Sequence, residues 1–280
     1  MLPNYKRPVL KTLLHRLEEK LPRLINISGP RQCGKTTLIQ QALEQSRRPF
    51  RYLSADLPAP AALPQWGHYD VAPFILSVPF GHSPDARWLV HNWEQARIAA
   101  RQSDEGFILV LDEVHHIQDW SRIVKGLWDE DRRVGRSLHV VLLGSAPLVY
   151  RTSMHEALTG RFETIRLAHW SLEEMGAAFG VTLQEYIYFG GYPGAAHLTQ
   201  DEARWLDYVL DVLIEPTLDR DVLALSRIDK PMLLRQLFEL GSAYSGQIVS
   251  YNRLLGQLQD AGTPNTPLSL IHISEPTRPY

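Results

Sequence analysis

A glycine-rich segment with one lysine gives the sequence its clearest chemical signal. Residues 29–36 read GPRQCGKT and match G-x-x-x-x-G-K-[ST] in full, between an apolar run and a helical run. Glycines let the backbone curl so that successive N–H groups point inward, and the N-terminus of a following helix adds positive potential for phosphate. The segment therefore predicts a loop that binds nucleotide phosphates. The residues expected to form it are Gly29, Pro30, Arg31, Gln32, Cys33, Gly34, Lys35, Thr36 and Thr37.

Three side chains of this loop have separate predicted roles. Lys35 would reach the β- and γ-phosphates of ATP, and the Thr36 hydroxyl would bind Mg²⁺. Thr37 could contact the α-phosphate. The alternative is a glycine turn that only caps a helix, which the agreement of spacing and context disfavours.

Two adjacent acids, Asp112 and Glu113, follow the apolar run FILVL. Carboxylates at the end of a strand buried on both faces are costly to desolvate unless a cation meets them. We expect Asp112 to belong to the Mg²⁺ shell, and Glu113 to orient and activate an attacking water. An ordinary acidic strand end or helix cap is the alternative.

Two further residues are candidates for the same chemistry. Ser145 ends the next apolar run and could place a hydroxyl near the γ-phosphate, although capping of a helix that starts at Pro147 is nearly as well supported. Arg161 could neutralise charge that develops on the transferred phosphoryl group, in its own subunit or in a neighbour's site. A surface salt bridge is the alternative for Arg161.

Other reactive side chains receive no chemical role. His115 and His116 lack the H-E-x-x-H spacing of a zinc site, so we interpret them as solvated helix residues. Cys33 is interpreted as a variable loop position rather than a redox switch.

The elements expected to position these residues alternate between strands and helices. Strands are predicted from short apolar runs at 24–28, 50–56, 107–113, 138–145 and 163–170. Helices are predicted from apolar periodicity at 8–20, 36–45, 83–102 and 119–134. For the third helix we expect Ser83 as N-cap and Pro84 at the first helical position. The alternation implies crossover connections and a parallel sheet covered on both faces, and short helical stretches follow Trp170.

Composition excludes several classes of protein. Of the 280 residues, 44% are hydrophobic and 21% charged, and the net charge of -2 gives no global reason to expect nucleic acid. The single cysteine excludes an intramolecular disulfide framework and favours the cytoplasm. No signal peptide and no apolar run long enough to span a bilayer is apparent, so no membrane is expected as a partner.

Taken together, the motifs resemble prokaryotic AAA-type P-loop ATPases in which the AAA domain precedes a domain of unknown function, relatives of the signal-transduction ATPases. The segments that carry the resemblance span about residues 5–200 and are YKRP, ISGPRQCGKTTL, FILVLDEVHHIQDW, VVLLGSAPL, LTGRFETIRL and FGGYPGA. The resemblance implies ATP hydrolysis with ATP and Mg²⁺, and an α/β parallel-sheet core of the AAA-like ASCE type. It also implies a helical lid and a following winged-helix segment. The motif positions for the Walker A, Walker B, sensor and arginine roles fall on Lys35, Asp112, Glu113, Ser145 and Arg161.

The expected domain limits follow from this resemblance. We expect the ATPase domain at 1–168, a helical lid at 169–225 and a partial winged-helix-like segment at 226–264. The last stretch, PLSLIHISEPTRPY, resembles translated sequencing-adaptor read-through. Residues 265–280 are therefore expected to be an artefactual tail, and the natural sequence to stop near 263–266.

The main functional hypothesis is an ATPase whose nucleotide state changes the angle between the core and the helical lid. One alternative is a nucleotide-dependent regulator with weak ATPase activity that binds duplex DNA through residues 230–260. A second alternative is a P-loop kinase, which Glu113 disfavours because a water-activating carboxylate promotes hydrolysis. The expected partners are ATP, duplex DNA at the C-terminal segment and other copies of this chain.

Overall fold

The computed structural model of this chain describes residues 4–55, 84–144, 157–218 and 231–260. The chain divides into two compact units, Met1–Trp205 and Leu206–Tyr280. The predicted tail at 265–280, the predicted N-cap Ser83 and the predicted sensor Ser145 lie outside the described residues.

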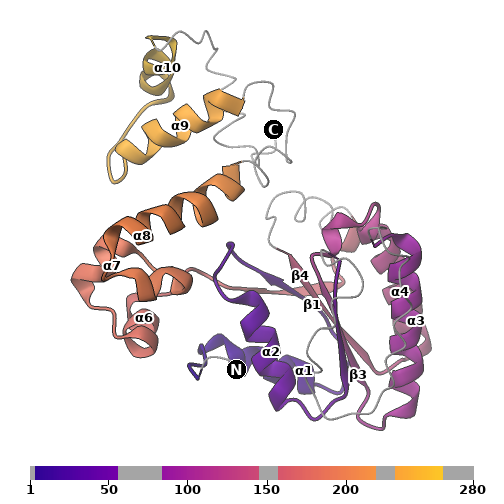
Figure 1. Ribbon diagram of the computed structural model, residues 1–280. Coiled ribbons are helices and arrows are strands. Elements are labelled where there is room, and N and C mark those ends of the chain that lie inside the picture. Colours follow the sequence, from indigo (N-terminus) through magenta and orange to yellow (C-terminus); the bar gives the residue numbers. More distant parts are fainter. Residues whose placement is uncertain (1–3, 56–83, 145–156, 219–230, 261–280) are drawn as a thin grey trace. The chain divides into compact units, whose positions relative to one another are not determined.

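The first unit is built on a five-stranded parallel sheet with the order β2–β3–β4–β1–β5 (Figure 1). The strands are β1 (Leu24–Ser28), β2 (Phe50–Ser54), β3 (Phe107–Asp112), β4 (Leu138–Gly144) and β5 (Phe162–Arg166). The carboxyl ends of β1, β3 and β4 meet at one edge, because Ser28 is in register with Gly144 and Asp112 with Leu143. This edge holds both the glycine-rich loop and the acid pair.

Helices cover both faces of the sheet (Figure 1). They are α1 (Val9–Glu18), α2 (Lys35–Gln45), α3 (Ala86–Gln102) and α4 (Trp120–Val134). On β3, Leu109 and Leu111 pack in a core cluster with α3 and α4, whereas Ile108 and Val110 pack in a second cluster with α1 and α2. The continuous apolar run of β3 is explained by this arrangement, since neighbouring side chains on a strand point to opposite faces and both faces are buried. The predicted α/β fold class is confirmed.

The start of α3 differs from the prediction. The helix begins at Ala86 rather than at Pro84, and its N-cap is Asp85. The Asp85 side chain accepts a hydrogen bond from the Trp88 backbone N–H at 2.9 Å. Aspartate caps a helix as well as serine does, so Asp85, which directly precedes Ala86, can take this position.

Within the first unit, helices follow the last strand, as predicted. They are α6 (Leu172–Phe179), α7 (Leu183–Phe189), the 3-10 helix η2 (Pro193–Leu198) and α8 (Glu202–Tyr208), which runs across the boundary between the units. Capping boxes begin α6 and α7, at Ser171 with Glu174 and at Thr182 with Glu185. These caps satisfy backbone N–H groups that helix geometry leaves without partners.

The second unit contains the π-helix η3 (Val209–Ile214), α9 (Pro231–Ala243) and α10 (Tyr251–Asp260). A leucine cluster joins α9 to α10 and consists of Leu233, Leu237, Leu254, Leu255 and Leu258. The two helices predicted within 230–260 are therefore present, whereas the domain limits and the winged-helix assignment stay predictions. No helix of the described residues has the length and apolar character needed to cross a membrane.

His139 connects β4 to the turn that enters β1. Its side chain is fully buried, its Nδ1 accepts a hydrogen bond from the Arg23 backbone N–H at 3.3 Å, and its Nε2 lies 3.1 Å from the Glu19 carbonyl oxygen. The Arg23 bond needs an unprotonated Nδ1, so the ring is neutral and Nε2 donates to Glu19. Burial, together with the nearby Arg48 charge, lowers the pKa of His139 to about 4.

We expect His139 to make the protein sensitive to acid. An unfolded histidine has a pKa of about 6.5, so between that pH and about 4 the unfolded chain binds a proton that the folded chain does not. The contribution of His139 is complete above pH 6.5 and is lost as the pH falls towards 4, by up to about 3 kcal/mol. Urea unfolding of the wild type and of His139→Gln at a series of pH values measures it. Equal pH slopes for the two proteins would contradict this prediction.

Candidate nucleotide-binding site

The loop between β1 and α2 needs its two glycines for different reasons. At Gly29, an added Cβ would lie 2.5 Å from the Leu167 carbonyl oxygen, so a side chain would push the loop away from the end of β5. Gly34 is the N-cap of α2 and has a φ of 89°, a backbone conformation that residues with a side chain rarely adopt. Both positions therefore need glycine for the loop to take its observed shape.

Lys35 extends its ammonium group back into the loop. The side chain is largely buried, and Nζ donates hydrogen bonds to the carbonyl oxygens of Gly29 at 2.9 Å and of Pro30 at 2.6 Å. Burial lowers the pKa of Lys35, and the charges of Glu113 and Asp112 oppose this shift. A cation held at the mouth of a loop of this shape can pair with phosphate oxygens.

The Cys33 side chain lies in the core and not on the surface of the loop. Its side chain is 1% exposed and packs in the core cluster beneath the loop, with Leu38 and Ile165 among its members. Burial raises the pKa of the Cys33 thiol, which disfavours the thiolate needed for redox chemistry. Only the backbone of Cys33 can contribute to ligand binding.

Tyr52 on β2 brings the two predicted metal ligands together. Its hydroxyl donates to Asp112 Oδ2, and it also shares a hydrogen bond with the Thr36 side chain. Burial raises the pKa of Asp112, and the bond from Tyr52 opposes this change. Thr36 and Asp112 therefore meet around one phenol, and their oxygens form a donor set suited to Mg²⁺. Sequence reasoning missed Tyr52, because only the pairing of β2 with β3 places it beside the acid.

Glu113 occupies a strained backbone position directly after β3. Its φ is 52°, in the left-handed region, and its backbone N–H donates to the Leu143 carbonyl oxygen at 3.0 Å. Left-handed conformations of residues other than glycine are uncommon and cluster at functional sites. The strand therefore ends at Asp112, and the left-handed conformation of Glu113 follows it directly.

A histidine pair lies next to this carboxylate. His115 and His116 are on the 3-10 helix η1 (Val114–His116), and His115 Nδ1 lies 3.2 Å from Glu113 Oε2. One ligand atom from each of Glu113, His115 and His116 lies within 4.8 Å of the others, close enough to surround a cation. The interpretation of both histidines as solvated is wrong for His115, whose side chain is 11% exposed. The tight turn of η1 makes this grouping without H-E-x-x-H spacing.

Arg161 lies at the opposite edge of the sheet from the loop. It directly precedes Phe162, which is in register with Leu24 at the start of β1, whereas the loop follows Ser28 at the end of that strand. Five residues of strand separate the two edges by about 16 Å. Arg161 also forms a two-pronged ion pair with Asp129, at 2.7 and 3.0 Å. A role at the nucleotide of its own chain is therefore wrong, and the surface salt bridge is present.

A pocket of about 610 Å³ lies at the edge of the sheet where β1 and β5 begin, close to Arg161. It is lined by Arg23, Arg132, Arg161 and Glu163 among others. It is separate from the loop and the acid pair.

The predicted sensor Ser145 lies outside the described residues. The strand before it, β4, ends at Gly144 in register with Ser28, beside the start of the loop.

The sheet and the loop define the class of protein. The glycine-lysine-threonine loop follows β1, the acid pair lies at the end of β3, and β4 lies between these two strands. This is the arrangement of a P-loop NTPase. Residues 22–176 match the family model described as AAA domain, and residues 180–270 match a domain of unknown function (DUF8612). The first match covers more than half of the 280 residues, so the chain belongs to the AAA family of P-loop ATPases. The predicted resemblance is confirmed.

Three solved structures match the chain, and the first of them supports its fold. A Walker-type ATPase of Pyrococcus abyssi is 17% identical, with a TM-score of 0.60 over 98% of this chain and 90% of that one. Cdc6p of Pyrobaculum aerophilum is 14% identical, with a TM-score of 0.41 over 97% of this chain and 87% of that one. ORC1 of Aeropyrum pernix, solved in complex with DNA, is 11% identical, with a TM-score of 0.44 over 97% and 83%. No curated protein matches the chain.

Proposed function

We propose that this chain binds ATP with Mg²⁺ at the β1–α2 loop and hydrolyses it. The observation that carries the proposal is the meeting of Thr36 and Asp112 around the Tyr52 hydroxyl. These two residues come from different elements, and a shared ligand explains why a half-buried carboxylate and a threonine of the first turn of α2 come to one point of the sheet edge.

The residues of the site have separate proposed roles. Lys35 exchanges its carbonyl partners, Gly29 and Pro30, for the β- and γ-phosphates, while the loop amides bind the remaining phosphate oxygens. Thr36 and Asp112 would hold Mg²⁺, which supplies positive charge to the phosphate oxygens. Glu113 accepts a proton from water, whose oxygen attacks the γ-phosphorus, and ADP departs as the bond to the γ-phosphoryl group breaks.

A phosphate-release assay tests this function. Purified protein given ATP and Mg²⁺, with no acceptor molecule, is expected to retain nucleotide and to release inorganic phosphate continuously. Failure to retain nucleotide would remove the proposal. Phosphate transfer that needs an added small acceptor would instead support the kinase alternative.

Arg161 is proposed to act at the nucleotide of a neighbouring copy of the chain, because it lies at the edge far from its own loop. Mixing Arg161→Ala chains with Lys35→Ala chains would then restore hydrolysis, and no restoration would exclude this role.

Four further expectations stay predictions. They are lid movement driven by nucleotide, a homo-oligomer, binding of duplex DNA through residues 230–260 and a cytoplasmic location.

A further inference from the structure

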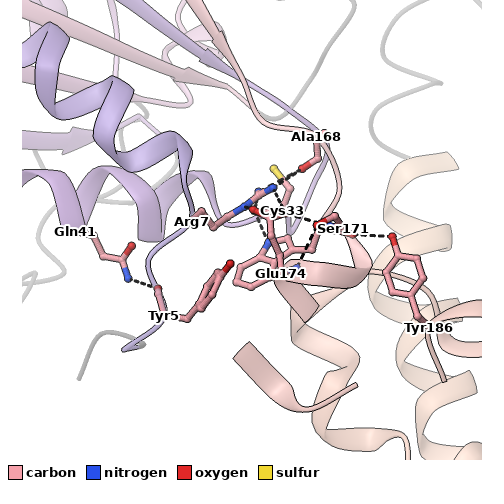
Figure 2. Close-up of polar contacts among 9 residues, drawn as sticks. Tyr5, Arg7, Cys33, Gln41, Ala168, Ser171, Glu174 and Tyr186 are labelled. Atoms are coloured by element: carbon pink, nitrogen blue, oxygen red, sulfur yellow. Dashed lines mark hydrogen bonds and ion pairs between the residues drawn. The ribbon is translucent and has the colours of Figure 1, made fainter. Parts of the chain in front are cut away.

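A buried arginine from the segment before α1 joins three parts of the first unit (Figure 2). Arg7 is 8% exposed, and its Nε and Nη2 bind the two carboxylate oxygens of Glu174 on α6 at 2.8 and 2.9 Å. Its Nη1 donates to the Cys33 carbonyl oxygen at 3.1 Å, and Nη1 and Nη2 both lie 3.3 Å from the Ala168 carbonyl oxygen. One guanidinium therefore connects the glycine-rich loop, the segment after β5 and α6.

Trp170 holds the same carbonyl group. Its indole Nε1 donates to the Cys33 oxygen at 3.0 Å, and the Arg7 guanidinium carbon lies 5.1 Å from the centroid of its ring. Trp170 is itself buried with Met175 and Val181. The Cys33 carbonyl oxygen thus accepts hydrogen bonds from a charged donor and a neutral donor, both fixed by their own packing.

The two hydrogen bonds to the Cys33 carbonyl oxygen fix the direction of the Gly34 N–H. A trans peptide unit is planar, so the C=O of Cys33 and the N–H of Gly34 point in opposite directions. With the carbonyl held on the Arg7 and Trp170 side, the Gly34 N–H must face the other way. The Cys33 side chain is anchored in the core, which leaves this peptide little freedom to rotate by other means.

The ion pair with Glu174 keeps Arg7 in this place. A buried guanidinium is stable only when its charge and its donors have partners, and Glu174 supplies the charge. The Ser171 backbone N–H also donates to Glu174 Oε2 at 3.0 Å, so the carboxylate that orients Arg7 belongs to the capping box of α6. The position of α6 is thereby linked to the peptide in the loop.

We propose that Arg7, Trp170 and Glu174, together called the outer brace, position the Cys33–Gly34 peptide so that the Gly34 N–H faces bound phosphate. Arg7 and Trp170 are positioning residues, because they act through the Cys33 carbonyl and not on the nucleotide. The inference rests on the proposed function, since it assumes that phosphate binds in this loop.

A double-mutant cycle on MgADP affinity tests the outer brace. Trp170→Phe keeps the aromatic ring and deletes the Nε1 donor, whereas Arg7→Lys keeps a charge for Glu174 and loses the planar fork of donors. Either change leaves one donor on the Cys33 oxygen, so each is expected to weaken MgADP binding about threefold. The double variant frees the peptide and is expected to lose about 30-fold or more, which exceeds the product of the single effects.

Tyr186→Phe is the matched control. The Tyr186 hydroxyl donates to the Trp170 carbonyl oxygen at 2.8 Å, so this change deletes one hydrogen bond of the same region without touching Cys33. It is expected to leave MgADP affinity unchanged, even if thermal unfolding of the nucleotide-free chain shifts as it does in Trp170→Phe. A purely structural role for the outer brace would move the unfolding temperatures of these variants and leave their nucleotide affinities equal.

The outcomes separate the two proposals. A wild-type chain that does not bind MgADP overturns the proposed function and, with it, the outer brace. A wild-type chain that binds, together with brace variants that bind equally well or whose losses only multiply, overturns the outer brace alone.

Discussion

Glu113→Gln is expected to lower ATP hydrolysis by about 10²- to 10⁴-fold, the usual contribution of a general base, while the chain still binds nucleotide. Glutamine has nearly the same shape, and its amide cannot accept a proton from water. Asp112, Thr36 and Lys35 are unchanged in this variant, so the phosphates and Mg²⁺ keep their proposed partners. The variant therefore separates turnover from binding.

Two measurements on the same preparations decide this prediction. Nucleotide affinity is measured by calorimetry with MgADP, and turnover by release of phosphate from MgATP. Glu44→Gln serves as the control, because Glu44 is an exposed residue of α2 and the change in charge is the same. Hydrolysis in Glu113→Gln at the rate of this control would show that another group activates the water.

Much of the sheet could be predicted because local sequence and tertiary packing agree there. The apolar run of β3 has Leu109 facing one helical layer and Val110 facing the other, so every residue of the run needs to be apolar. The loop was equally clear, since Gly34 is needed for a positive φ and the spacing to Lys35 is fixed by the start of α2. Each of these signals depends only on nearby residues.

The parts that the sequence did not predict depend on contacts between distant residues. Tyr52 reaches Asp112 across 60 positions, and Arg7 reaches Glu174 across 167. The residues around Arg7 do not predict its burial, because this burial comes from Trp170 and α6. Hydrophobic periodicity predicts which face of an element is buried, but it does not predict which polar groups meet there.

The position of Arg161 depends on the pairing of β5. The type of this residue and its motif do not determine at which end of the strands it lies. In a parallel sheet the residues before a strand and those after it lie at opposite edges, and β5 begins at Phe162. The position of Arg161 therefore follows from the start of β5, once that strand is known to pair in parallel with β1.

Lys35→Ala is expected to abolish nucleotide binding, with a loss of about 100-fold or more in affinity for MgADP. The lysine ammonium donates to two carbonyl oxygens of the loop, and charge-assisted bonds to phosphate each contribute about 1.5–3 kcal/mol.

Lys11→Ala is the control for Lys35→Ala, because Lys11 is an exposed residue of α1 and the loss of charge is the same. The control is expected to bind MgADP as the wild type does. If Lys35→Ala bound equally well, phosphate could not lie in the β1–α2 loop. Thr36 and Asp112 would then lose the ligand that explains their meeting at Tyr52, and the Cys33–Gly34 peptide would have no phosphate to face. Binding of phosphate at the carboxyl edge therefore depends on this ammonium group.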